Sequence, residues 1–492
     1  MLFTEPIFLF CFLPVLLALY FAPSLARAFP GAGLAHSRYA NWLLLVASVI
    51  FYATGGGAFT WLMLGSTAFN YWMAILVDRH RETALGQRLL VFTVSANLVV
   101  LGIFKYANFF VDNANGVLVL AHLPALALPR VLLPIGISFF TFHAISYVVD
   151  VYRRDATAQK SPVHAALYLL LFPQLIAGPI IRYRDIADQL ASRIVRLDDV
   201  SQGIRRFILG LAKKVLIANI VAGPADRIFG MPAAQLSTGH AWLGVVCYTL
   251  QIYFDFSGYS DMAIGLGRMF SFRFPENFRY PYIASSVQDF WRRWHMSLST
   301  WFRDYLYVPL GGNRVSQAAM YRNLVTVFFL CGLWHGASWN FVIWGLFHGA
   351  FLVIERLGLA NTVKRLPPVV RHAYLLVVVM IGWVFFRAET LAGALLFLKA
   401  MAGLNHAAPT PFTPGWYLTP QLWLALVAGA VGSAPLVPAL GRWRERRLAA
   451  RPSAGAATAF GLAGTSALVV LTLASILQIA ARTYSPFIYF RF

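Results

Sequence analysis

Three histidines between positions 295 and 348 are the residues of this chain best suited to proton transfer: His295, His335 and His348. Histidine changes its charge near neutral pH, so a neutral imidazole can accept a proton from a hydroxyl group and return it later. The sequence around them is apolar and aromatic, as in FWRRWH and GLWHGASWNF. Ionisable groups are costly in such surroundings, which favours a functional role.

The sequence contains no motif that is typical of several other catalytic mechanisms. The chain contains no G-x-S-x-G elbow, H-E-x-x-H helix or Walker loop, and the segment Gly265–Phe270 lacks the last glycine of a dinucleotide-binding loop. The cysteines Cys11, Cys247 and Cys331 lie in apolar runs without C-x-x-C spacing, which indicates buried thiols. We therefore expect no metal site and no bound cofactor.

Of the three histidines, His335 has the sequence surroundings most typical of a buried active site. Gly332 and Gly336 would let two helices approach closely beside it. Two tryptophans and an amide would then line the site: Trp334, Trp339 and Asn340. The alternative is a core histidine that bridges two helices.

His295 ends a run of aromatic and basic residues, and two interpretations are open. Trp291 and Trp294 could lie at the lipid head groups, with Arg292 and Arg293 on phosphates, as in an interfacial belt. The alternative, that His295 lines the same site as His335, is what the family resemblance described below implies.

His348 is harder to bring to that site. If one helix runs through His335 and continues over 339–354, thirteen residues separate the two histidines by about 20 Å, on nearly opposite faces. We therefore expect His348 to pack between helices or to lie at the far end of the site.

Two further polar groups stand near this region. Asp255 and Asp261 in FDFSGYSD are expected to form buried ion pairs with Arg268 or Arg273, or to accept from backbone donors. The turn YVPLGGNR favours glycine. Asn313 and Arg314 in this turn could help wrap a phosphate, or the segment could simply be a tight loop.

Composition indicates lipid as the solvent for the elements that position these residues. Charged residues make up 12% of the chain and hydrophobic residues 59%, with a mean hydropathy of +0.65, whereas soluble domains carry about 25% charged residues. We predict an all-α, multi-pass membrane protein with roughly ten to thirteen spanning or re-entrant helices. With no visible repeat, residues 1–492 are expected to form a single domain.

The spans can be placed from the apolar runs. A break is expected at Gly55–Gly57, a short interfacial segment at 116–129, and a broken or re-entrant segment at 167–181. The first run lacks a preceding basic segment and is expected to be a retained helix. The expected spans are 7–21, 41–52, 59–77, 89–104, 133–154, 242–254, 324–330, 341–354, 373–386, 422–437 and 460–479.

The net charge of +21 comes from basic residues that lie between the apolar runs. This distribution is typical of cytoplasmic loops near anionic lipid, and it argues against nucleic-acid binding. Residues 191–214 are expected to form an amphipathic surface helix. Its basic residues could contact lipid head groups or a phosphate-bearing donor: Arg205, Arg206, Lys213 and Lys214.

The central block resembles a known family. FWRRWHMSLSTWFRDYLYVPLGGNR followed by GLWHGASWNF is similar to the membrane-bound O-acyltransferase (MBOAT) family, in particular the bacterial branch that O-acetylates alginate and related exopolysaccharides. LPIGISFFTFHAISYVVDVYR, FPQLIAGPIIRY, GLAKKVLIAN and the final PFIYFRF extend the similarity. The resemblance implies helices around a central tunnel, with His335 as the central catalytic residue and His295 beside it.

The resemblance also implies a reaction. An acyl thioester, acetyl-CoA or an acyl carrier, would be the co-substrate on the cytoplasmic side, with His335 as general base and His295 steadying the thioester carbonyl. The acetyl group would pass across the cell inner membrane to periplasmic acetyltransferase or esterase-like partner proteins. Two alternatives are a D-alanyl transferase of a cell-wall polymer and a transporter or flippase. The transporter would show repeat symmetry and paired broken helices.

Overall fold

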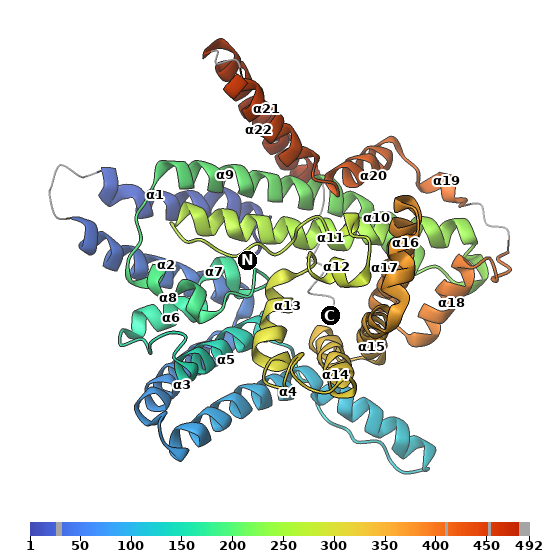
Figure 1. Cartoon of the computed structure of the whole chain (residues 1–492), viewed down its shortest axis with the longest axis horizontal. Coiled ribbons are helices and arrows are strands. Elements are labelled where there is room, and N and C mark those ends of the chain that lie inside the picture. Colours follow the sequence, from blue (N-terminus) through green and yellow to red (C-terminus); the bar gives the residue numbers. More distant parts are fainter. Residues whose placement is uncertain (26–31, 409–411, 451–453, 482–492) are drawn as a thin grey trace. The chain divides into compact units, whose positions relative to one another are not determined.

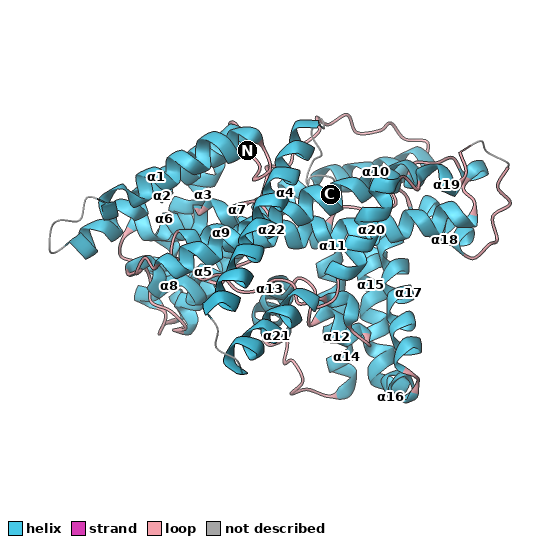
Figure 2. Ribbon diagram, turned by 90° about the horizontal axis from the view of Figure 1, so that it is seen from above, coloured by secondary structure: helices cyan, strands magenta, loops and turns pink. Residues whose placement is uncertain are grey.

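A computed structural model describes residues 1–25, 32–408, 412–450 and 454–481 of the 492-residue chain. All regular secondary structure in these ranges is helical, and Figure 2 draws helices and loops without a strand. The predicted all-α fold is therefore confirmed. The described residues form two compact units, one of residues 1–204 and 263–275 and the other of residues 205–262 and from 276 onward. The single domain stays a prediction.

The first unit contains the helices of the first part of the chain (Figure 1). They are α1 (Leu13–Leu25), α2 (Ala32–Gly56), α3 (Phe59–His80), α4 (Ala84–Leu120), α5 (Ile137–Arg153), α6 (Pro162–Leu170), α7 (Phe172–Leu175) and α8 (Tyr183–Ala191). A π-helical turn, Phe8–Phe12, precedes α1. Two longer helices contribute residues to both units: α9 (Leu197–Ala212) and α11 (Thr238–Met269).

The second unit contains most of the helices that carry the predicted site. They are α10 (Asn219–Phe229), α12 (Val287–Trp291), α13 (Met296–Phe302), α14 (Gln317–His335), α15 (Trp339–Ile354), α16 (Ala360–Arg365), α17 (Pro368–Arg387), α18 (Leu391–Met401), α19 (Pro414–Tyr417), α20 (Pro420–Gly432), α21 (Leu436–Ala450) and α22 (Ala454–Ala481). Single π-helical turns follow α9, α13 and α15.

Within the described ranges, six helices are long and apolar enough to cross a membrane, and the bent pair α20–α21 would make a seventh. They are 38–56, 84–120, 197–229, 339–365, 368–387 and 454–481. The chain is therefore a multi-pass membrane protein. The predicted number of ten to thirteen segments is not confirmed. The predicted first span forms a shorter apolar helix, Phe8–Pro23.

Two predicted interruptions are confirmed. Helix α2 ends at Gly56, and Gly57 adopts a positive φ of 52° before α3 begins. Residues 167–181 form the end of α6 and the single turn α7, then continue without helix, and the whole segment is buried. Burial in protein is the condition under which broken backbone is tolerated at membrane depth.

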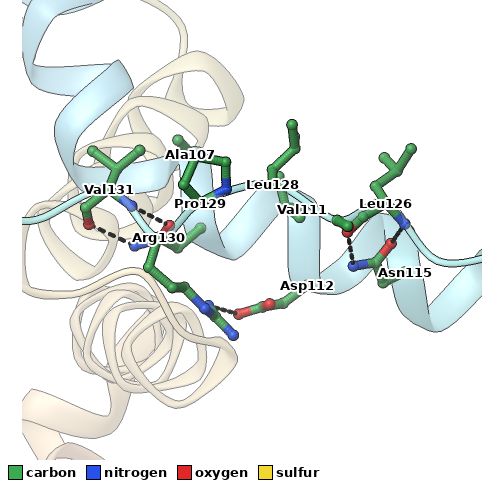
Figure 3. A pocket seen from close by; sticks show the side chains of 11 residues that line it. Ala107, Val111, Asp112, Asn115, Leu126, Leu128, Pro129, Arg130 and Val131 are labelled. Atoms are coloured by element: carbon green, nitrogen blue, oxygen red, sulfur yellow. Dashed lines mark hydrogen bonds and ion pairs between the residues drawn. The ribbon is translucent and has the colours of Figure 1, made fainter.

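Residues 116–129 do not form a separate short segment, because α4 continues through Gly116 to Leu120. Their interfacial position stays a prediction. The chain then returns along α4 as an extended segment that is held by two asparagines. Asn108 exchanges hydrogen bonds with the backbone of Val131, and Asn115 with that of Leu126 (Figure 3).

The surface helix predicted for residues 191–214 is also wrong in extent. Helix α9 passes through the π-helical turn Lys213–Ala218 into α10, so residues 197–229 form one 33-residue stretch that is apolar enough to span. The reason is the apolar sequence VLIANIVAG, which directly follows the two lysines and prolongs the helix.

Helices α14 and α15 form a hairpin that reverses the chain directly after His335. A Cβ atom on Gly332 would lie 2.3 Å from the carbonyl oxygen of Phe341 and 3.3 Å from the Cα of Gly345. Such close backbone packing requires glycine. The close helix approach predicted at Gly332 is confirmed, whereas Gly336 lies just after α14 and faces the ring of Phe341. A single helix through His335 is wrong.

This packing gives a first prediction. Gly332→Ala should lower the thermal stability and membrane abundance of the chain, because the new methyl group collides with backbone rather than with a flexible side chain. Gly461→Ala in α22 is the matched control, since its Cβ would meet nothing within 4 Å. Alanine is about 1 kcal/mol better than glycine inside a helix. Equal melting temperatures of the two detergent-solubilised variants would contradict the close contact.

Candidate active site

His335 is the last residue of α14 and is buried in an aromatic cage. Its ring centroid lies 4.9 Å from that of Trp334, 4.9 Å from that of Trp344 and 5.1 Å from that of Phe386. These rings come from α14, α15 and α17, so the reversal at residues 336–338 builds the cage. An imidazole in such surroundings is held in one place and shielded from water.

His295 begins α13 in a left-handed backbone conformation, with a φ of 43°. Its Nδ1 atom lies 3.0 Å from Oδ1 of Asn277. The backbone N–H and the hydroxyl of Ser297 donate to the same oxygen, at 3.2 and 2.9 Å. A backbone N–H can only donate, so this atom of Asn277 must be the acceptor oxygen. The proton between His295 and Asn277 therefore belongs to Nδ1 of His295.

This tautomer decides what His295 can do. With the proton on Nδ1, the Nε2 atom carries a lone pair, and that buried atom has no hydrogen-bond partner among the described residues. Burial also lowers the pKa of His295 to about 3, so the ring is neutral at physiological pH. Nε2 can accept a hydrogen bond but cannot donate one. His295 is therefore not suited to steady a thioester carbonyl, which requires a donor.

The two predicted catalytic histidines pack against one residue, Trp334. The ring centroids of His295 and Trp334 are 6.1 Å apart, and those of Trp334 and His335 are 4.9 Å apart. Phe256 and Phe278 also contact His295, and their ring centroids lie 4.6 and 6.3 Å from that of its imidazole. The fold thus brings together the two histidines that stand 40 positions apart in the sequence.

His348 lies much nearer to this cluster than the single-helix geometry predicted. Its ring centroid is 5.2 Å from that of Trp344, which also contacts His335, and 5.0 Å from that of Trp291. Neither ring nitrogen has a hydrogen-bond partner among the described residues. The hairpin explains the difference, because α15 runs back along α14 and carries His348 beside the same aromatic rings.

The remaining predicted site residues are placed differently. Asn340 is buried and donates to the backbone oxygen of Ala388 at 2.5 Å, whereas Trp339 is 56% exposed. Asn313 and Arg314 are exposed in the turn that precedes α14. Helix α14 begins at Gln317 and ends at His335, so this turn and His335 lie at opposite ends of a helix of about 27 Å.

The turn before α14 has the geometry that its glycines predicted. Gly311 and Gly312 adopt φ values of 100° and 54°. Asn313 accepts a hydrogen bond from the hydroxyl of Tyr307 at 2.6 Å, which closes the turn on itself. The described contacts are those of a tight loop, which was one of the two alternatives.

The two aspartates of FDFSGYSD form buried ion pairs, as predicted, but with other partners. Asp261 pairs with Arg206 at 2.8 Å and with Lys213 at 2.6 Å, and Asp255 pairs with Lys214 at 2.6 Å. Three of the four basic residues expected to contact lipid or donor are therefore used inside the protein. Sequence could not show this, because the pairing depends on how α9 packs on α11.

Two residues that sequence reasoning missed hold the segment carrying His295. Asn277 fixes the tautomer, and the buried Glu355 accepts hydrogen bonds from the backbone N–H groups of Val287 and Gln288, at 2.8 and 3.1 Å. Those two groups open α12, the helix that leads to His295. An acidic residue in an apolar span was the available signal, since a buried carboxylate requires donors.

Two cavities are lined by residues of the first unit. One, of about 190 Å³, lies between α4 and the extended segment 126–131 and is bridged by the ion pair of Arg130 with Asp112 (Figure 3). The other, of about 490 Å³, lies at the start of α2. No group of three His, Cys, Asp or Glu side chains in the described part of the chain is arranged to hold a metal ion.

Comparison with known families identifies the class of this histidine site. The family model of the membrane-bound O-acyltransferases (MBOAT) matches residues 136–396, which include His295, His335 and His348. This match covers more than half of the chain. The chain belongs to the membrane-bound O-acyltransferase family. It is therefore an O-acyltransferase, which excludes the transporter alternative.

Relatives extend the similarity beyond this family match. The probable alginate O-acetylase of Pseudomonas putida is 44% identical, over 100% of both chains. The peptidoglycan O-acetyltransferase of Helicobacter pylori is 38% identical, over 82% of this chain and 80% of its own. The teichoic acid D-alanyltransferase of Bacillus subtilis is 32% identical, over 44% of this chain and 58% of its own.

The hydrogen bonds of Asn277 give a second prediction for this MBOAT enzyme. Asn277→Ala should slow acyl transfer about tenfold, because loss of a buried hydrogen-bond partner costs about 1–3 kcal/mol and releases the tautomer of His295. Asn277→Asp should retain most of the rate, since a carboxylate oxygen still accepts from His295 and Ser297. The measurement is the initial rate of acyl transfer, normalised to membrane protein.

Asn313→Ala is the control for this experiment. This substitution removes the side chain of an asparagine in an exposed turn. That side chain accepts a hydrogen bond from the hydroxyl of Tyr307. Equal rates for Asn277→Ala and Asn277→Asp would show that the acceptor oxygen of Asn277 does not act through His295.

Proposed function

We propose that this protein O-acetylates an exopolysaccharide such as alginate and works in the cell inner membrane. The observation that carries the proposal is the 44% identity, over the whole of both chains, with a probable alginate O-acetylase. The pairing of His295 and His335 on Trp334 supplies side chains for proton transfer in a buried, aromatic site.

The proposed reaction is acyl transfer from a thioester. His335 takes the proton from the acceptor hydroxyl, whose oxygen attacks the carbonyl carbon of the thioester. The tetrahedral intermediate then collapses, the carbon–sulfur bond breaks, and the proton on His335 goes to the departing thiolate. The acetyl ester and a free thiol are the products, and no net proton is released.

His295 has a supporting role in this reaction. Its Nε2 lone pair accepts a hydrogen bond from a neighbouring hydroxyl of the sugar acceptor and so orients the reacting hydroxyl towards the thioester and His335. A pKa of about 3 makes His295 a weak base, whereas an effective general base has a pKa near the working pH. This favours His335 as the residue that takes the proton.

The donor and the partners follow from the same proposal. Acetyl-CoA or an acyl carrier delivers the thioester from the cytoplasm, and the acetyl group passes to periplasmic acetyltransferase or esterase-like proteins that modify the polymer. Basic residues between the spans raise the local concentration of an anionic donor. Donor use is testable with proteoliposomes and radiolabelled acetyl-CoA, with and without an acyl carrier.

Transfer of D-alanine to a cell-wall polymer is the second candidate. It is supported by the 32% identity with a teichoic acid D-alanyltransferase. That similarity covers 44% of this chain, compared with 100% for the alginate O-acetylase and 82% for the peptidoglycan O-acetyltransferase. The wider coverage favours O-acetylation.

The decisive experiment uses His335. A general base contributes roughly 10²–10⁴-fold to the rate, so His335→Ala and His335→Gln should both abolish acetylation of the exported polymer. Both variants should reach normal membrane abundance, because neither adds a charged group to a span. His295→Gln should reduce acetylation less, since it leaves His335 in place.

The measurement is the acetyl content of the polymer, with a membrane blot for each variant. His406→Gln, which changes an exposed histidine, is the control. Near-normal acetylation by His335→Gln would remove the catalytic assignment. Loss of membrane protein in His335→Ala together with partial rescue by His335→Gln would indicate a structural histidine.

A further inference from the structure

A second polar site lies in the first unit, at the cavity of about 490 Å³. Its walls are the start of α2, the start of α6 and the end of α8. The lining residues are Arg38, Asn41, Trp42, Ser161, Val163, His164 and Ala191. No lining side chain is acidic, Arg38 is positively charged, and the imidazole of His164 can donate a hydrogen bond through its ring N–H.

A second arginine, Arg193, contacts the cavity wall through Asn41. Arg193 donates to Oδ1 of Asn41 at 2.6 Å and to the backbone oxygen of Gln189 at 2.8 Å, and its guanidinium lies 4.0 Å from the ring centroid of Phe272. Its Nε is buried without a hydrogen-bond partner among the described residues. Burial and the charge of Arg193 both lower the pKa of His164, so the positive potential of Arg193 reaches the cavity.

Some basic residues of the same unit are neutralised by carboxylates. Arg182 pairs with Asp185 at 2.8 Å, and Arg184 pairs with Asp155 at 2.7 Å. Within the described ranges, neither Arg38 nor Arg193 forms an ion pair with a carboxylate. None of the residues outside those ranges is Asp or Glu. The protein therefore supplies no acidic side chain to balance the charge at this cavity.

The position of the cavity suggests which kind of anionic ligand it binds. Arg38, in the second turn of α2, directly precedes the uncharged residues 39–56 of that helix, so it lies near the edge of the apolar stretch. Trp42, one turn further on the same face of α2, is 57% exposed, as is typical of tryptophan at the lipid–water boundary. Basic pockets between spans at this depth bind anionic head groups.

The start of α6 adds one backbone donor beside the cavity, the N–H of Val163, because Pro162 has no N–H and that of His164 donates to Ser161. Ser161 caps this nine-residue helix, and its side chain accepts from the backbone N–H of His164. The first N–H groups of a helix point outward from its end and favour an anion there. Arginine, imidazole and helix N–H groups together are the donors that proteins use for phosphate.

We propose that this cavity is a phosphate-binding site, in which Arg38 and His164 hold the phosphate and Arg193 supports Asn41 behind it. The phosphate belongs either to an anionic phospholipid of the surrounding leaflet or to a soluble phosphate-bearing molecule. The site is distinct from the histidine pair and does not depend on the identity of the acceptor polymer.

The test measures binding of phosphatidylglycerol to the full-length protein in detergent, by native mass spectrometry. Arg38→Gln and His164→Ala should each weaken binding, by about fivefold for the loss of one arginine charge. Arg38→Lys should retain most of it, because the charge remains. Arg88→Gln, which neutralises an exposed arginine at the start of α4, is the control and should bind as the unchanged protein does.

Two competitors distinguish the sources of the phosphate. If inorganic phosphate or coenzyme A displaces phosphatidylglycerol from the unchanged protein but has no effect on Arg38→Gln, the site takes soluble phosphates. If neither displaces the lipid, the site is specific for a head group. The proposal is overturned if Arg38→Gln and His164→Ala bind phosphatidylglycerol as strongly as Arg88→Gln does.

Discussion

The close contact of two glycines is the constraint on which the candidate active site depends. Gly332 and Gly345 bring α14 and α15 so near that a methyl group on either would meet backbone. This contact reverses the chain directly after His335 and places Trp344 and His348 beside it. The imidazole of His335 is thus positioned by backbone packing, and aromatic rings surround it.

Three buried carboxylates inside the second unit are paired with cations or backbone donors. Asp255 and Asp261 neutralise lysines and an arginine of the neighbouring helix, and Glu355 accepts from the first N–H groups of α12. Unpaired charges at such positions would cost several kcal/mol each. In the first unit, Arg38 lines a cavity and Arg193 donates to Asn41 in its wall, and neither arginine forms an ion pair with a carboxylate within the described ranges.

The histidine pair illustrates how a tautomer follows from surrounding hydrogen bonds. Because the N–H of Ser297 must donate, Asn277 must present its oxygen, and His295 must carry its proton on Nδ1. The same chain of reasoning leaves Nε2 as an acceptor. His295 and His335 therefore have different roles in the proposed reaction although both are buried histidines beside one tryptophan.

Sequence by itself determined the helical, lipid-embedded class and the breaks at Gly57 and in residues 167–181, because composition and local backbone preference are properties of short segments. Which distant residues contact one another was decided only by the tertiary structure. The partners of Asp261, the place of His348 and the role of Asn277 each depend on residues far away in the chain that helix packing brings together. No local pattern encodes which faces of two helices will meet.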